Sequence, residues 1–195
     1  MEYRFKNFNS GFTFIELVIV LSIFAILTGI TMFNFTDFNS NVSLRNLVHE
    51  VAMQINQAQN EAISGRYNSA GFVGDEAPSY GVYFNIATPN QFIYFADLNK
   101  DGIYNNSSVF DCGYLGEECL NEININTGDT VTGLCSELSC DSILELNITF
   151  TRPFPDAVMK ETATDDFSNA KITVSGAKRG TKSIKISSLG QISVH

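Results

Sequence analysis

An apolar segment near the N-terminus constrains this chain more than any other feature. Leu17 to Phe33 contains no ionisable side chain, and Glu16 is the only charged residue between Phe12 and Thr36. About 20 such residues in an α-helix span the hydrocarbon core of a bilayer. Because a buried helix of a globular core usually keeps a polar face, the segment 12–36 is predicted to be a single transmembrane helix.

Basic residues ahead of this segment predict its orientation. Arg4 and Lys6 precede the apolar run, with Glu2 as the only nearby acid. Positive residues beside the first helix hold that end in the cytoplasm, so everything after Thr36 is expected on the outer side of the membrane. A cleaved secretory signal also begins this way, but no Ala-x-Ala cleavage site follows the apolar run.

Glu16 lies at the start of this apolar segment. A carboxylate costs on the order of 2.5–3.5 kcal/mol at the bilayer centre and less near the interface. On physical grounds alone, two interpretations stay open: the acid snorkels to the membrane surface, or it has a specific partner.

Residues 10–17 (Ser-Gly-Phe-Thr-Phe-Ile-Glu-Leu), followed by the apolar run, resemble the N-terminal signature of type IV pilins and type II secretion pseudopilins. The resemblance implies that residues 1–11 form a leader, which a prepilin peptidase removes between Gly11 and Phe12. It also implies that the peptidase, which is a methyltransferase too, methylates the new amine of Phe12. In the filament, Glu16 would pair with the Phe12 ammonium of a neighbouring subunit.

The same resemblance implies partners and a location. The precursor would lie in lipid as a single-pass protein of the bacterial inner membrane, with its N-terminus in the cytoplasm. An assembly platform in that membrane would then add it to other pilin subunits in an extracytoplasmic filament. We expect a minor pilin or pseudopilin that acts structurally.

Beyond the apolar run, the pattern becomes periodic. Apolar residues recur every three or four positions from Leu44 to Ala62, which predicts that 37–65 is the amphipathic second half of the same helix, capped by Gly65. Aromatic and β-branched runs then predict strands at 80–86, 91–96, 144–151, 170–174, 183–187 and 191–194. The expected fold is therefore α+β, a pilin fold with one long helix packed on an antiparallel sheet. Residues 66–195 would form the head, with a loop-rich insertion at about 97–143. Three of the late strands, near 171–174, 183–186 and 190–194, also resemble the C-terminal end of GspH/FimT-class minor pilins.

The motif Asp97-Leu98-Asn99-Lys100-Asp101-Gly102 resembles the start of an EF-hand calcium loop. Oxygen ligands at Asp97, Asn99 and Asp101, with the Ile103 carbonyl at position 7, match that pattern, but position 12 is Ser108 instead of glutamate. Closure by Asp111, Glu117 or Glu118 would complete a structural Ca²⁺ site, as in some pseudopilins that hold calcium in an acidic loop. The alternative is an Asx-rich turn that follows a strand and binds no ion. In either case, we expect that the protein requires no cofactor.

Four cysteines, Cys112, Cys119, Cys135 and Cys140, fall in the same region. An even number in an exported domain predicts two disulfides, and proximity favours Cys112 with Cys119 and Cys135 with Cys140. A four-cysteine zinc site is the alternative, although the spacing fits it poorly.

Charge is segregated along the chain. The net charge of -9 argues against general nucleic-acid binding, yet no acid follows Asp166. Some minor pilins of the GspH/FimT class bind DNA through a basic C-terminal motif similar to Gly-Arg-x-Arg. Lys178, Arg179, Lys182 and Lys185 are the candidate DNA-binding residues here, although their order departs from that motif. Solubilising lysines on an exposed edge are the alternative.

No glycine-rich phosphate loop, nucleophile elbow or histidine-rich metal motif occurs in the sequence. We therefore expect no catalytic activity.

Overall fold

The computed structural model describes residues 11–65, 77–105, 112, 117–136, 142–162, 166–176 and 180–195. The side chains of residues 33–41 and of Ser142 lie outside this description. Two compact units follow one another along the chain, with the boundary between Asn39 and Ser40.

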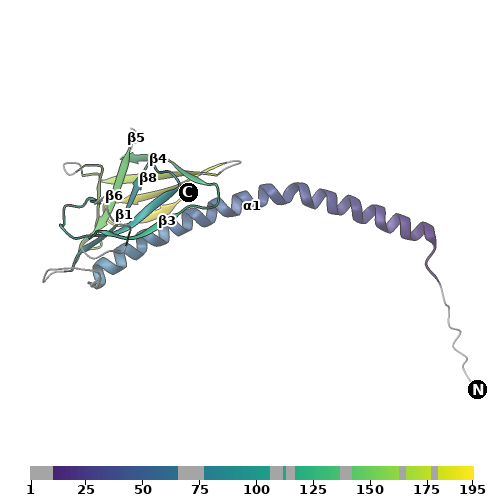
Figure 1. Cartoon of the computed structure of the whole chain (residues 1–195), viewed down its shortest axis with the longest axis horizontal. Coiled ribbons are helices and arrows are strands. Elements are labelled where there is room, and N and C mark those ends of the chain that lie inside the picture. Colours follow the sequence, from purple (N-terminus) through teal and green to yellow (C-terminus); the bar gives the residue numbers. More distant parts are fainter. Residues whose placement is uncertain are drawn as a thin grey trace, which may run out of the picture. The chain divides into compact units, whose positions relative to one another are not determined.

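One long helix, α1 (Phe14–Ser64), connects the two units (Figure 1). Gly65 ends it as predicted: its φ is +63°, in the left-handed region, and its amide donates to the Ala62 carbonyl at 3.2 Å. The predicted apolar stripe lies inside the second unit, where Val48, Val51 and Ile55 are fully buried. The amphipathic half of the helix therefore belongs to the core of the head.

Among the residues that the structure describes, ten strands lie in the head. They are β1 (Ser79–Asn85), β2 (Gln91–Asp97), β3 (Cys119–Asn124), β4 (Thr130–Ser136), β5 (Ser142–Ile143), β6 (Glu145–Phe150), β7 (Ala157–Lys160), β8 (Asn169–Ser175), β9 (Thr181–Ser187) and β10 (Ile192–Val194). All of their pairings are antiparallel. The α+β class and the antiparallel pairing are as predicted.

The strands form two sheets instead of the single sheet expected from the sequence. Sheet A has the order β3-β2-β1-β6-β7, and sheet B has the order β10-β9-β8-β4-β5. Alternation of apolar and polar residues reports which face of a strand is buried, but not which sheet the strand joins. The chain passes from sheet A to sheet B between β3 and β4, and returns to sheet A at β6.

The segment 97–143, for which the sequence predicts mostly loops, supplies β3 and β4. Strand β3 lies at an edge, where Asn121, Glu122 and Asn124 are exposed, so its sequence lacks a clear apolar face. Strand β4 is irregular near Gly133, where its pairing with β8 shifts register. Both features weaken the alternating signal of a strand.

One hydrophobic core joins the two sheets and the second half of α1. Phe84, Phe92 and Phe150 of sheet A, Leu134 and Ile172 of sheet B, and the stripe of α1 all belong to it. A hydrogen bond also joins β2 to α1, because the Tyr94 hydroxyl donates to the Glu61 carboxylate at 2.6 Å. The head therefore packs as one three-part structure around residues 44–62 of α1.

Candidate functional site

Thr13 and Glu16 form a reciprocal cap at the start of α1. The Glu16 carboxylate oxygen Oε2 accepts the Thr13 backbone N–H at 3.1 Å and the Thr13 hydroxyl at 2.9 Å. In return, the Glu16 N–H donates to Thr13 Oγ1 at 3.3 Å. This arrangement is a capping box, which satisfies backbone donors that the first helical turn leaves free.

Thr13 is therefore a second residue of this site, and it is not among the residues predicted from the sequence. The spacing Thr-x-x-Glu directly before an apolar run is itself a recognised start signal of helices. Thr13 could therefore have been predicted together with Glu16. In the isolated chain, the Glu16 carboxylate already has polar partners within its own helix.

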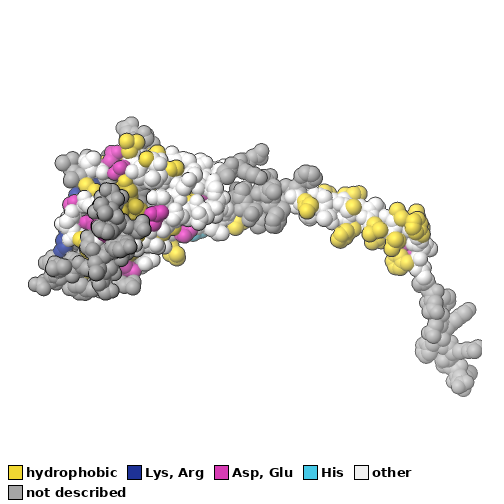
Figure 2. Space-filling view, viewed as in Figure 1, with side chains coloured by type: hydrophobic (Ala, Val, Ile, Leu, Met, Phe, Trp, Pro, Cys, Tyr) yellow, Lys and Arg dark blue, Asp and Glu magenta, His cyan; other side chains and the backbone are white. Residues whose placement is uncertain are grey.

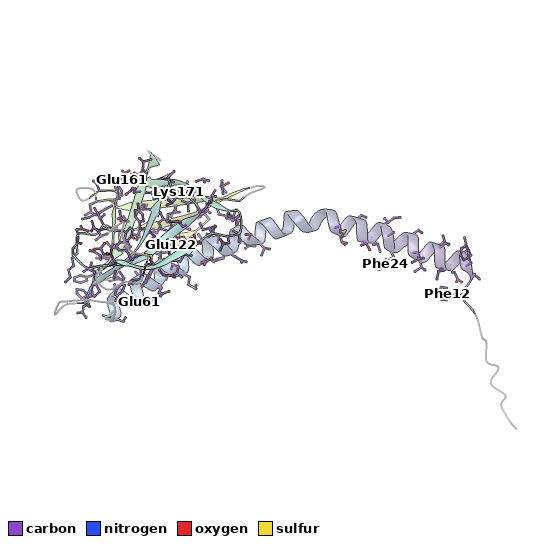
Figure 3. All side chains as sticks on the ribbon, viewed as in Figure 1. Phe12, Phe24, Glu61, Glu122, Glu161 and Lys171 are labelled. Atoms are coloured by element: carbon purple, nitrogen blue, oxygen red, sulfur yellow. A yellow bond between two sulfur atoms is a disulfide. The ribbon has the colours of Figure 1, made fainter. Side chains whose placement is uncertain are left out.

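The helix surface after this cap is apolar and exposed. Phe14–Met32 is long and apolar enough to cross a membrane, the one such helix among the described residues. Hydrophobic side chains cover this part of α1 (Figure 2). Phe24 of this segment is 68% exposed, and Phe12, just before the helix, is 78% exposed (Figure 3). Such a surface is unfavourable in water, at about 25 cal/mol per Å², so lipid or other apolar helices must cover it.

The few hydroxyl groups of this segment are satisfied internally. Ser22, Thr28 and Thr31 donate to backbone carbonyls three or four residues earlier, at 2.8–2.9 Å. Side chains paired in this way enter an apolar environment at little cost. The segment therefore suits surroundings without water.

Residues 6–32 match the family model of the prokaryotic N-terminal methylation motif. The N-terminus therefore carries a motif of the prepilin type. The matched segment includes Gly11, Phe12 and Glu16, the predicted processing and assembly residues. No curated protein and no solved structure matches the chain.

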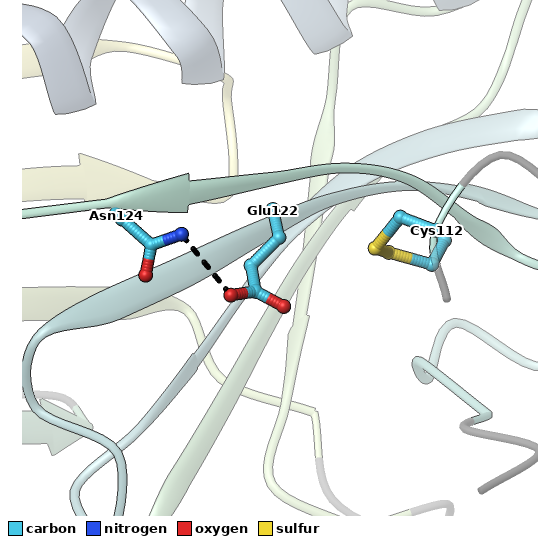
Figure 4. Close-up of a disulfide and its surroundings, with 4 residues drawn as sticks. Cys112, Glu122 and Asn124 are labelled. Carbon is cyan, nitrogen blue, oxygen red and sulfur yellow. Dashed lines mark hydrogen bonds between the residues drawn. A yellow bond between two sulfur atoms is a disulfide. The ribbon is translucent and has the colours of Figure 1, made fainter. Parts of the chain in front are cut away.

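The head contains disulfides. Cys112 pairs with Cys119, the first residue of β3, as predicted, and their Cα atoms are 4.7 Å apart. Figure 4 shows this disulfide near Glu122, whose carboxylate accepts the Asn124 side-chain amide at 3.2 Å. Cys135 is disulfide-bonded as well, and Cys140, its predicted partner, lies outside the described residues. Oxidised sulfurs are not available as the four thiolates of the alternative zinc site.

The predicted calcium loop follows β2 and turns back on itself. Lys100 and Gly102 have left-handed φ values of +62° and +80°. The turn brings the Gly102 N–H to Asp97 Oδ2 at 3.0 Å and the Ile103 N–H to Asp101 Oδ1 at 2.8 Å. The structure thus brings together the four predicted residues, Asp97, Asn99, Asp101 and Ile103, in one hydrogen-bonded loop.

The loop is fixed on the outer face of sheet A. The Tyr104 ring packs against the rings of Tyr83 and Phe95, with centroids 5.1 and 5.4 Å apart. The Tyr104 N–H donates to Asn147 Oδ1 of β6 at 2.9 Å. These contacts fix the position of the loop against sheet A.

Glu118 joins this loop from the start of β3. Its carboxylate accepts the Leu98 N–H at 3.3 Å through Oε1 and the Asn105 N–H at 2.6 Å through Oε2. Of the other predicted closing residues, Glu117 lies close enough to Tyr104 for its charge to help raise the pKa of that phenol, which burial raises most, and Asp111 lies outside the described residues, as does Ser108 at position 12. Glu118 is therefore the closing carboxylate that contacts the loop.

Burial perturbs two carboxyl groups of the loop. It raises the pKa of Asp97, an effect that the Gly102 N–H opposes and the nearby Asp101 charge reinforces. Burial also raises the pKa of Glu118, and the charges of Asp97 and Asp101 add to this increase. Three negative groups therefore interact with one another at this site.

The candidate DNA-binding residues do not share one face. Lys185 of β9 is exposed and lies directly opposite Lys171 of β8, on the outer face of sheet B. Lys182 lies opposite the buried Val174, so it belongs to the other face. Lys178 and Arg179 lie outside the described residues.

Proposed function

We propose that this chain is a structural subunit, a minor pilin or pseudopilin, of a type IV pilus-like or type II secretion filament. The match of residues 6–32 to the N-terminal methylation motif carries this proposal. A prepilin peptidase cleaves the precursor between Gly11 and Phe12 and methylates the new N-terminus. The protein works by assembly, without catalytic turnover.

The precursor is held in the inner membrane by the apolar half of α1, with Arg4 and Lys6 in the cytoplasm and the head outside. The Cys112–Cys119 disulfide supports an outer location for the head, because disulfides persist in oxidising compartments and are rare in the cytosol.

Assembly exchanges the partner of Glu16. In the precursor the carboxylate caps its own helix through Thr13. In the filament it pairs with the Phe12 ammonium of a neighbouring subunit, which fixes the register between helices. The exposed apolar side chains of α1 provide most of the cohesion between subunits. Once the helix has left the lipid, the helices of other subunits must cover these side chains.

Mass spectrometry of the protein recovered from cells tests the processing step. We expect a chain that begins at Phe12 and carries one additional methyl group. A chain that begins at Met1 would contradict the proposal.

A Glu16→Val variant tests the assembly step separately. It keeps Gly11 and Phe12, so cleavage is expected to proceed, but the variant is expected to be depleted from sheared filaments. Incorporation at the level of the unmodified chain would rule out the pairing of Glu16 with Phe12.

DNA binding by the head is the second candidate function. It rests on Lys171 and Lys185, since two like charges directly opposite on neighbouring strands are unfavourable unless an anion lies between them. Replacing both lysines with glutamine should weaken DNA binding and reduce the number of counterions released on binding by about two. Lys182→Gln, on the other face, should change neither quantity. An unmodified chain that fails to bind DNA at low salt would eliminate this function.

A further inference from the structure

The two sheets of the head carry opposite charge. The strands of sheet A contain three acidic residues and one lysine, whereas those of sheet B contain three lysines and no acidic residue. Figure 3 labels one residue of each set, Glu122 of β3 and Lys171 of β8. The single lysine of sheet A, Lys160, is engaged by the loop after β2, where it donates to the Asp101 backbone carbonyl at 3.0 Å.

Two carboxylates flank a tyrosine on the outer face of sheet A. Glu122 lies opposite Ile93, and Ile93 lies opposite Tyr83, in one row across β3, β2 and β1. Because Tyr83 stands between two core residues of β1, this row points away from the core. Two residues further along β1, Asn85 lies opposite Glu145 of β6 on the same face.

Hydrogen bonds hold this face in place, and its potential is negative. The Asn85 side-chain amide donates to the Tyr83 hydroxyl oxygen at 2.8 Å and to Glu145 Oε1 at 2.9 Å. Burial raises the pKa of Tyr83, and the charge of Glu145 adds to this increase. Burial also raises the pKa of Tyr104, to which the charges of Glu122 and two neighbouring glutamates contribute. Half-buried tyrosine rings beside carboxylates suit contact with a cation.

The outer face of sheet B has the complementary character. Lys171 of β8 lies directly opposite Lys185 of β9, and each stands between two core residues, so both point away from the core. Around them the face carries small hydroxyl side chains, including Ser193 opposite Lys185 and the pair of Thr173 and Ser183. Like charges directly opposite each other are unfavourable, so this pair gains from an anionic partner. The small neighbours let another flat surface approach the two ammonium groups.

We propose that the outer face of sheet B docks on the outer face of sheet A of a second copy of this chain. Lys171 and Lys185 of one copy then pair with Glu122 and Glu145 of the other, beside Tyr83. Charge complementarity selects this occupant, because one chain supplies both faces. The docking, which rests on the proposed function of a filament subunit, adds a contact between heads to the contacts between helices.

The geometry of the two faces suits a repeating contact. Glu122 and Glu145 stand three strand spacings apart, about 14 Å, and the flexible four-carbon stems of two neighbouring lysines can diverge toward both. Because the two faces differ, each docked copy leaves one face of each kind open, so further copies can add in a row. Charged pairs of this kind fix orientation and partner choice more than affinity. The head contact thus sets how neighbouring heads face each other.

Self-association of the full chain in detergent micelles, measured by sedimentation, tests this proposal. The unmodified chain should associate at about 20 mM NaCl and about tenfold more weakly at about 500 mM, because salt screens exposed charges. The double variant Lys171→Glu, Lys185→Glu has two acidic faces, and Glu122→Lys, Glu145→Lys has two basic faces. Each alone should associate about tenfold more weakly than the unmodified chain.

Complementation identifies the faces that meet. Mixing the two double variants, or combining all four substitutions in one chain, restores opposite charges and should return association to within about threefold of the unmodified level. Lys182→Glu, on the other face of β9, is the matched control and should leave association unchanged. Thermal unfolding at the original temperature verifies that each variant is folded.

The outcomes separate this docking from the other functions. An unmodified chain that does not associate at low salt, or folded variants that fail to complement, would overturn the proposal. Loss of DNA binding in Lys171→Glu, Lys185→Glu without complementation would assign the lysine pair to DNA instead. A chain that is processed and enters filaments but shows no complementation would overturn the docking alone. Complementation in a chain that begins at Met1 would overturn the proposed function and leave the contact between the two faces.

Discussion

The Glu16 carboxylate accepts hydrogen bonds from both the backbone amide and the hydroxyl of Thr13. The carboxylate is therefore not an orphan charge in the isolated chain. In the proposed filament, assembly would replace one set of hydrogen bonds with another, so the contact between Glu16 and a neighbouring subunit would contribute more to register than to binding energy.

Thr13→Val should loosen the first turn of α1. Valine removes the hydroxyl that pairs with Glu16, and the loss of a helix N-cap costs about 1 kcal/mol. We expect roughly five-fold faster hydrogen exchange of the first-turn amides in detergent micelles, measured by NMR. Thr13→Ser keeps the hydroxyl and should leave these exchange rates unchanged. Equal exchange in the valine variant would show that the cap does not stabilise the turn.

Leu146→Ala should strongly destabilise the head. Leu146 of β6 is fully buried, so its truncation leaves a cavity in the core and costs about 2–5 kcal/mol. The neighbouring Leu144 is 66% exposed, and Leu144→Ala should change the free energy of unfolding by no more than about 0.5 kcal/mol. Denaturant unfolding of both variants measures the contrast, and similar losses would contradict the placement of the core.

Gly81→Ala should destabilise sheet A. A Cβ atom at this position would lie 2.6 Å from the Ile148 carbonyl oxygen and 2.9 Å from a ring carbon of Phe95. Because a backbone atom and a buried ring must move, we expect a loss of about 1–3 kcal/mol in thermal or denaturant unfolding.

Gly133 is the control for this substitution. A Cβ atom at Gly133 would lie 3.6 Å from the Thr173 side chain, an ordinary contact distance. Gly133→Ala should therefore have little effect, and a loss as large as that of Gly81→Ala would show that crowding is not the cause.

Replacing Cys112 and Cys119 together with serine should lower the stability of the head by about 2 kcal/mol. The disulfide closes a short loop of seven positions, and in the chain-entropy account short loops give modest stabilisation. Thermal unfolding with the remaining cysteines oxidised measures the change. Unfolding at the original temperature would show that other contacts already fix this segment.

Much of the fold is encoded in local patterns. The stripe from Leu44 to Ala62 and the alternating strands predict burial directly, and the structure confirms the helix, its Gly65 cap and the hairpin between β1 and β2. Strand β3 is not predicted from the sequence because it is a polar edge strand. Strand β4 is not predicted because its pairing is irregular near Gly133.

The candidate sites also differ in how far local sequence predicts them. Gly11, Phe12 and Glu16 form a contiguous motif, so sequence alone suffices to place them, and Thr13 is readable from the same few residues. The contact of Glu118 with the loop depends on the pairing of β2 with β3, which brings the Ala96 amide to the Glu118 carbonyl at 2.8 Å. No local pattern encodes that register. The separation of Lys182 from Lys185 follows from strand alternation, once the bounds of β9 are known.

The route of the chain through the head has a consequence for folding. Because the chain passes from sheet A to sheet B and repeats the passage after β7, strands remote in sequence must meet before either sheet is complete, as β1 and β6 do in sheet A and β4 and β8 do in sheet B. Pairings between strands so far apart in sequence slow folding. A chain that ended after β5 would keep β1 and β4 but lack their partners β6 and β8, so neither sheet could complete its pairing.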